Sequence, residues 1–213
     1  MIKKIYLLPL FLLTLSFIAC NETEEPGKYD NWRERNEAFI DSLQLVYDSP
    51  NKGNLERVQD PRDKKSYIFF KRMENGDKYD ENGDEIKLPL FTSKVTMFYR
   101  GMYINEAIFS AAKAPEYFVT KLYAENGIDV FTEIFKGSDP SLEFDSPATF
   151  KVNETISGWI EILQLMRPGD RFEVYIPYQC AYGESGKNAR GEQVTMGYTT
   201  LIYDMRMERI DEY

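Results

Sequence analysis

Histidine is absent from this sequence, and cysteine occurs only twice in 213 residues. Without histidine the chain cannot form a Ser-His-Asp triad, a Cys-His dyad or a histidine-based zinc site. Cys20 follows an apolar segment near the N-terminus, whereas Cys180 lies in an apolar run far along the chain. If Cys20 carries a modification, Cys180 has no partner for an internal disulfide, and we expect it to pack in the core.

Basic residues are also scarce: 26 lysines and arginines stand against 35 acidic residues, which gives a formal net charge of −9. Loss of Lys3 and Lys4 with a leader would lower this charge by two, from −9 to −11. Such a charge repels phosphate backbones, so nucleic acid is not an expected partner. The acidic loop at residues 80–84 has its glycine in the wrong place for a calcium loop. We therefore predict no metal site and no cofactor.

The one long apolar run lies at the N-terminus. Lys3 and Lys4 precede an apolar stretch at residues 5–17, which is short for a bilayer span and typical of a removable export signal. The next residues, FIAC at 17–20, resemble the lipobox of bacterial lipoproteins, although Phe17 replaces the usual aliphatic residue.

The lipobox resemblance implies a signal peptide over residues 1–19 and a lipid on Cys20. Residues 20–30 are polar and acidic, which predicts a flexible tether. The protein would then be lipid-anchored in the cell envelope, at the outer membrane of a Gram-negative bacterium, and face either the periplasm or the surface. An ordinary secretory signal or an uncleaved anchor is the alternative.

Residues 31–47 predict an amphipathic helix, because apolar side chains recur there at helical spacing. Asn31 and Glu34 match a capping box at its start. An isolated helix of this length is marginal in water, so its apolar stripe must be buried on the rest of the chain or in a homodimer formed through residues 31–47. Both alternatives stay open from the sequence. We assign residues 31–65 to an N-terminal helical extension.

From Tyr67 onwards apolar residues alternate with a period of two, which is typical of strands. In the run at 94–102, this period places Tyr99 on the same face as Val95 and Met97. Residues 156–166 instead have helical spacing, and Pro168 with Gly169 ends that helix. Such a short helix needs a sheet around it, so we predict an α+β domain. Strands are expected at 67–73, 94–102, 171–177 and 199–207, whereas the insert at 102–130 could be a helix or a hairpin.

Three segments together resemble FKBP-type peptidyl-prolyl cis-trans isomerases in their exported lipoprotein form. They are TMFYRGM at 96–102, FKVNETISGWIEILQLMRPGDRFEVYIPYQCAYG at 150–183 and YTTLIYDMRM at 198–207. The resemblance implies an FKBP-like domain over residues 66–213, in which an antiparallel sheet is half-wrapped around one short helix. It also implies a shallow aromatic pocket that binds the proline of a peptide.

The resemblance assigns roles to residues of that pocket. Trp159 would form the floor, the backbone N–H of Ile156 would bind a substrate carbonyl, and the hydroxyl of Tyr182 would bind the peptide. In full, it implies catalytic positions at Tyr99, Phe131, Ile156, Trp159 and Tyr182, and substrate-binding positions at Phe150, Thr155, Val194 and Tyr203.

The sequence departs from the family pattern at two places beside the pocket. Where the family has a Phe-Asp pair, this chain has Phe131-Thr132, and the alternative register uses Phe144-Asp145. Thr195-Met196 replaces the usual Ile-Pro before the last strand, with Val194 as a packing substitute. Turnover and specificity are therefore less firmly implied than the fold.

Two functions of different classes follow from these residues. The first is a membrane-tethered prolyl isomerase that acts on proline-containing segments of exported proteins. The second is a non-catalytic FKBP-like module that binds peptides or a partner as a chaperone, and Thr132 and Thr195-Met196 favour it. A purely structural spacer is a third reading.

Overall fold

The computed structural model of the protein describes residues 29–64, 66–104, 129–133, 139–143 and 145–212, with side chains of 129–133 left aside. The predicted signal peptide, Cys20, nearly all of the tether and most of the 102–130 insert lie outside these residues. Within the described part of the chain, none of the helices combines the length and the apolar character needed to cross a membrane.

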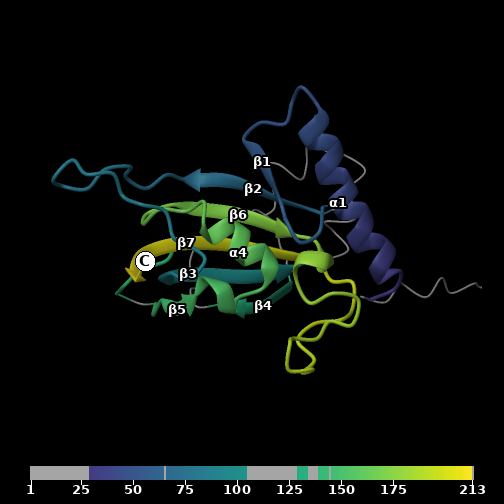
Figure 1. Ribbon diagram of the computed structural model, residues 1–213. Helices are drawn as coiled ribbons and strands as arrows, with labels where there is room; N and C mark the ends of the chain where they lie inside the picture. Colours follow the sequence, from purple (N-terminus) through teal and green to yellow (C-terminus); the bar gives the residue numbers. More distant parts are fainter. Residues whose placement is uncertain (1–28, 65, 105–128, 134–138, 144, 213) are drawn as a thin grey trace, which may run out of the picture.

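The described strands form one antiparallel sheet with the order β1-β2-β6-β7-β3-β4, while β5 pairs with β3 on the same edge as β4 (Figure 1). The predicted strands are all present, and β7 extends five residues beyond its predicted end. No pattern had predicted β1, β4 or β5. Their bounds are β1 Leu55–Gln59, β2 Tyr67–Glu74, β3 Lys94–Tyr103, β4 Asp129–Glu133, β5 Ala148–Lys151, β6 Arg171–Ile176 and β7 Leu201–Glu212.

One face of the sheet wraps the short helix α4 (Ser157–Leu163), as predicted (Figure 1). The fold also has two short 3-10 turns. The turn η1 (Val152–Glu154) directly precedes α4, and the turn η2 (Tyr178–Cys180) follows β6. Gly158 lets the helix approach closely, because a Cβ there would lie 2.4 Å from the side chain of Ile176. The buried core between helix and sheet includes Val95, Met97, Trp159, Leu163, Val174, Leu201 and Met205. Tyr99 packs against this core, on the predicted face.

The other face of the sheet carries α1 (Trp32–Asp48). The apolar stripe of α1 packs on the sheet of the same chain. Phe39 is fully buried, and the centroid of its ring lies 5.9 Å from that of Tyr175. The predicted capping box is wrong, because the backbone of Asn31 has the left-handed conformation (φ 49°) and its side chain makes no cap hydrogen bond. The sheet thus separates two cores, and this arrangement is an FKBP-like α+β fold with a helical extension.

Candidate functional site

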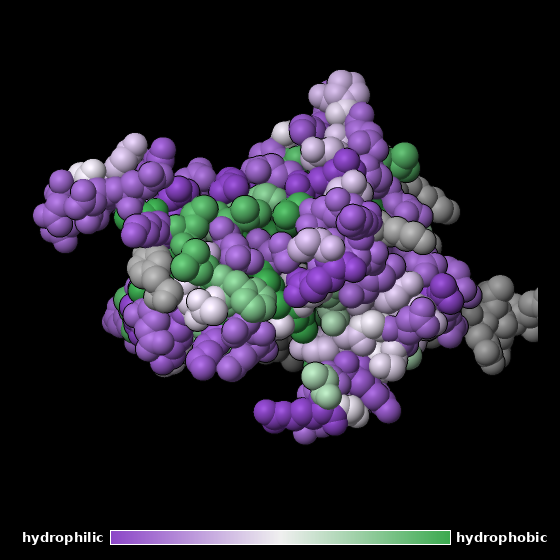
Figure 2. All heavy atoms as spheres, in the orientation of Figure 1, coloured by the Kyte–Doolittle hydropathy of each residue, from purple (hydrophilic) through white to green (hydrophobic). Residues whose placement is uncertain are grey.

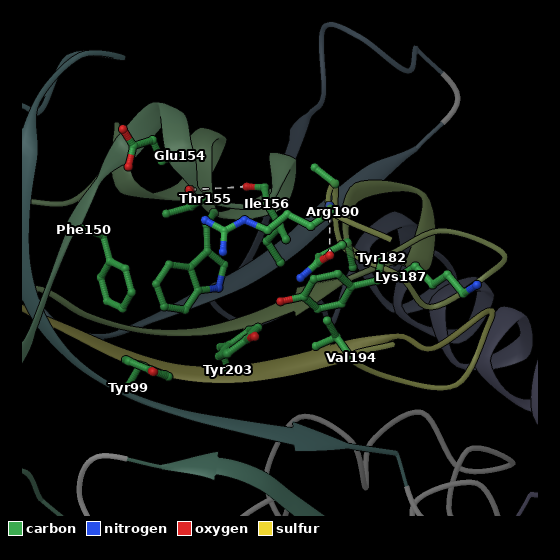
Figure 3. Close-up of a pocket in the computed structure, with 14 residues that line it drawn as sticks. Tyr99, Phe150, Glu154, Thr155, Ile156, Tyr182, Lys187, Arg190, Val194 and Tyr203 are labelled. Carbon is green, nitrogen blue, oxygen red and sulfur yellow. Dashed lines mark hydrogen bonds between the residues drawn. The ribbon is translucent and has the colours of Figure 1, made fainter. Parts of the chain in front are cut away.

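A cavity of about 740 Å³ opens between the start of α4, the sheet and the loop that precedes β7 (Figure 3). Strands β3, β5 and β7 contribute the rings of its wall, and the loops after β5 and η2 contribute the rim. Its lining residues are Tyr99, Phe150, Glu154, Thr155, Ile156, Trp159, Ala181, Tyr182, Lys187, Asn188, Ala189, Arg190, Val194 and Tyr203.

Trp159 lies at the base of this cavity, on the first turn of α4. Three rings stand almost perpendicular to its indole: Tyr203 at 5.0 Å, Tyr99 at 5.2 Å and Phe150 at 5.3 Å between centroids. Edge-to-face packing of this kind is favourable for aromatic pairs. Because each ring is fixed by its neighbours and by a strand, the cavity has a preformed apolar base.

Among the described residues, two hydrogen-bond donors at the beginning of α4 have no protein acceptor. The indole Nε1 of Trp159 is buried and has no partner among the described residues. No described group accepts a hydrogen bond from the backbone N–H of Ile156, the residue that precedes the helix. Helix N-termini leave such N–H groups unsatisfied. Thr155 instead turns its hydroxyl to the carbonyl of Val152, 2.8 Å away.

The hydroxyl of Tyr182 points towards the middle of the cavity (Figure 3). Burial, assisted by nearby Tyr99, raises the pKa of Tyr182 above its ordinary value. Burial also raises the pKa of Tyr203, well above its usual range. Both hydroxyls therefore remain protonated at neutral pH and can act as donors. The turn after Tyr182 needs Gly183, whose φ is +68°.

A loop over residues 183–198 forms one rim of the cavity, and its base is closely packed. A Cβ at Gly186 would lie 2.2 Å from the carbonyl oxygen of Thr195, and one at Gly197 would lie 2.0 Å from that of Glu184. Above this base, Lys187 and Gln193 form an antiparallel bridge. The loop is therefore held in one shape.

The structure gathers eight of the nine predicted site residues around this one cavity: Tyr99, Phe150, Thr155, Ile156, Trp159, Tyr182, Val194 and Tyr203. Phe131 lies in β4 at a register shift opposite β3, where Thr132 faces Gly101, and its side chain lies outside the described part. Phe144 of the alternative register also lies outside. Its neighbour Asp145 accepts a hydrogen bond from the backbone N–H of Ser141 at 2.9 Å.

Sequence reasoning missed the polar part of the rim. Lys187, Asn188 and Arg190 line the cavity, yet in the sequence they look like an ordinary solvated loop. The one signal that could have found them is their position directly after the AYG segment that carries Tyr182.

The C-terminal part of the chain is similar to FKBP-type proteins. Residues 134–208 match the family model for FKBP-type peptidyl-prolyl cis-trans isomerase. The fold resembles the crystal structure of FkpA from Escherichia coli, with a TM-score of 0.52 and 16% identity over 86% of this chain and 62% of that one.

Several curated proteins match by sequence, and two of them show the range of the similarity. The FKBP-type 22 kDa peptidyl-prolyl cis-trans isomerase of Escherichia coli (strain K12) is 39% identical over 61% of this chain and 47% of its own length. The macrophage infectivity potentiator of Trypanosoma cruzi is 43% identical over 35% of this chain and 36% of its own length. The chain thus spans less than half the length of these two relatives.

Proposed function

We propose that this protein is a peptidyl-prolyl cis-trans isomerase that assists the folding of exported proteins. The observation that carries this proposal is the apolar cavity with Trp159 at its base and unpaired donors at its edge. A proline ring fits such a base, since it is compact and apolar. The rings of Tyr99, Phe150 and Tyr203 would hold it on three sides.

The reaction breaks no covalent bond. It is a rotation about the X-Pro amide, and amide resonance opposes this rotation with a barrier of ~18–20 kcal/mol. An apolar cavity disfavours the charge-separated planar amide relative to the twisted form. The hydroxyl of Tyr182 and the N–H of Ile156 would bind carbonyl oxygens of the peptide. Donors that bind the twisted form better than either planar form lower the barrier. No imidazole, nucleophile or metal is needed for this mechanism.

The proposal predicts that Tyr182→Phe slows isomerisation, because it removes one hydroxyl and keeps the ring. The loss expected from one hydrogen bond is roughly three- to tenfold in kcat/KM. The measurement is NMR exchange between cis and trans forms of a short proline peptide, with no coupled protease. Trp159→Ala, with the fold checked by circular dichroism, should remove most of the remaining rate.

Tyr198→Phe is the matched control. Tyr198 lies in the same loop, but its hydroxyl donates to Glu184 at 3.0 Å and it does not line the cavity. It should keep the parental rate. A parental protein that shows no rate above the uncatalysed background, even at high concentration, would refute the isomerase proposal.

A non-catalytic binding module is the second candidate. Thr132 stands in the place of the family aspartate, and two apolar side chains on the rim loop are exposed, Val194 at 37% and Met196 at 44%. Exposed apolar groups beside a cavity suit extended, unfolded chains. Efficient catalysis of short peptides, together with no binding of an unfolded client protein, would count against this candidate.

We further propose that the protein is lipid-anchored through Cys20 in the cell envelope, in the outer membrane, as the leader at residues 1–19 suggests. Cys20→Ala should abolish incorporation of labelled palmitate and leave the leader uncleaved, so that the variant is larger than the processed parent. A parent that incorporates no palmitate and keeps its leader would show that the leader is a simple anchor. Protease accessibility on intact cells would then distinguish a surface-facing from a periplasmic domain.

A further inference from the structure

Arg190 lies at the mouth of the cavity and has no role in the isomerisation as described above. Figure 3 shows its side chain extending from the rim loop across the opening, with the guanidinium between Phe150 and Tyr182. In the part of the chain that the structure describes, no carboxylate lies within ion-pair distance of this guanidinium. Lys187, three residues earlier in the same loop, directs its ammonium group away from the rings (Figure 3).

The backbone that carries Arg190 is held in a tight turn. The side-chain oxygen of Asn188 accepts hydrogen bonds from the backbone N–H groups of Arg190 and Glu192, both at 3.0 Å. Gly191 has the positive φ of 80° that this turn requires, and its N–H donates to the carbonyl of Asn188 at 2.9 Å. The position of the Cα of Arg190 is therefore fixed, although its side chain is exposed.

The acidic groups near the opening are engaged elsewhere. Glu154 lies 3.6 Å from the ammonium group of Lys151, and Glu192 accepts a hydrogen bond from the amide of Asn188 at 2.7 Å. Glu184 accepts one from Tyr198. Among the described residues, Arg190 therefore has no ion-pair partner of its own, in a chain whose net charge is −9.

We propose that Arg190 is a specificity-determining residue, which favours proline segments with an aspartate or glutamate directly next to the proline. This inference rests on the proposed isomerase function and adds a substrate class to it. A guanidinium offers two parallel N–H groups to a carboxylate, and this geometry suits a planar acid better than a neutral amide. A proline held at Trp159 would bring the side chain of an adjacent residue under the guanidinium.

The expected preference is modest because the site is open to water. Exposed ion pairs contribute about 0.2–1 kcal/mol, so we expect a preference of roughly two- to fivefold in kcat/KM. Salt should reduce it, since exposed charges are screened. The preference should lie mainly in KM, because the carboxylate is bound equally in the planar and twisted forms of the amide.

The test compares four peptides, Ala-Glu-Pro-Ala, Ala-Gln-Pro-Ala, Ala-Pro-Glu-Ala and Ala-Pro-Gln-Ala, by NMR exchange with the full chain. The proposal expects at least one glutamate peptide to exceed its glutamine counterpart by about two- to fivefold at low salt. Arg190→Gln should bring this ratio to one, and Arg190→Glu should invert it. Lys187→Gln removes the same charge from the same loop and should keep the ratio above one.

Each ratio is taken within one variant, so any change in folding or in overall rate cancels. Equal rates on both peptides of each pair, with catalysis present, would overturn the proposal and leave the isomerase function intact. A ratio that Lys187→Gln lowers as much as Arg190→Gln would also overturn it, because a diffuse field would then explain the preference. Absence of catalysis on all four peptides would refute the isomerase function and this inference with it.

Discussion

Cys180 is a buried thiol that lies close in sequence to Tyr182 of the site. It lies in η2, two residues before Tyr182, and is fully buried in the core beneath α4. Burial, together with the charge of Asp60, raises the pKa of the Cys180 thiol to about 12. The thiol therefore stays neutral in the folded protein at a pH where the unfolded chain has lost this proton.

This difference predicts a loss of stability in alkali. Between pH 9 and 12 the folded state binds a proton that the unfolded state does not, so the free energy of unfolding falls by about 1.4 kcal/mol per pH unit. Below pH 9 both states are protonated and the thiol adds no pH dependence. In Cys180→Ala this contribution is absent. The difference between parent and variant, measured by urea unfolding, should shrink by about 2 kcal/mol from pH 8 to pH 10.5.

The buried tyrosines titrate in both proteins, so they cancel in that difference. A difference that stays constant up to pH 11 would show that the thiol is open to water.

Strands β2 and β6 hold a buried ion pair on the face of the sheet that carries α1. The ammonium of Lys71 lies 2.9 Å from Glu173, and their side chains are 5% and 3% exposed. The hydroxyl of Tyr175 donates to the same carboxylate. Buried charges of this kind are strongly destabilising when one partner is removed, because the remaining charge has lost both water and its counter-ion.

We therefore expect Lys71→Met to lower the free energy of unfolding by about 3–5 kcal/mol. The double variant Lys71→Met/Glu173→Met should recover much of this loss, since it leaves no isolated charge. Chemical denaturation with circular dichroism measures both values. The matched surface pair is Arg33 and Glu37, whose side chains are 51% and 39% exposed, and Arg33→Met should cost far less than Lys71→Met because water screens this pair. Equal costs for Lys71→Met and Arg33→Met would contradict the burial of the inner pair.

Elements with a strong period were predictable from the sequence, and those without one were not. The helix at 32–48 and the strands around Tyr99 and Val174 have clear helical or alternating patterns. By contrast, β1 is the five-residue segment LERVQ and β5 the four-residue segment ATFK, which are too short to show a period. Their pairing is set by the strands beside them, so no local pattern could predict it.

The candidate site, too, could be predicted only in part from the sequence. Its rings were predicted because Trp159 and Tyr182 lie in dense motifs of the family. The rim was not, because the direction of the Arg190 side chain depends on a turn fixed by Asn188 and Gly191, and a polar loop sequence does not encode that direction. The departures at Thr132 and Thr195 were noted, but their effect on turnover stays a prediction.

At the scale of the whole molecule, α1 connects the outer core to the loop that leads into β7. The indole of Trp32 donates to Thr199 at 3.0 Å, and the side-chain oxygen of Asn36 accepts from the backbone N–H of Thr200 at 2.7 Å. The helix thus supports the chain between the rim loop and the strand that carries Tyr203. A homodimer through residues 31–47 stays a prediction, and it would have to use the outward face of α1, where Leu45 is 68% exposed.

This arrangement predicts that both cores unfold together. The chain has two tryptophans, Trp32 on α1 and Trp159 in the inner core, so Trp32→Phe and Trp159→Phe each leave one local fluorescence probe. Adding Phe39→Ala to each background should lower the free energy of unfolding by about 3–5 kcal/mol, because it empties a buried site. The two probes should report the same midpoint in urea.

If Phe39→Ala shifts only the Trp32 transition, α1 is an independent appendage. Glu34→Ala serves as the control on the same helix, since its side chain is exposed, and it should change the free energy of unfolding reported by either probe by no more than about 0.5 kcal/mol.

The surface of the molecule mixes polar and apolar residues, with apolar side chains gathered over part of the face drawn in Figure 2. Exposed apolar residues include Leu90 and Phe91 before β3 and Leu142 before β5, in addition to Met196 on the rim.

The glycines at the base of the rim loop have one more consequence. Gly186 and Gly197 allow close backbone packing in the stem, and the side-chain amide of Gln193 donates to stem carbonyls, so the hairpin tip from Lys187 to Glu192 can be exchanged while these three residues are kept. A library of variants in this tip that keeps both glycines would change which peptides the cavity binds, while the sheet and α4 stay unchanged.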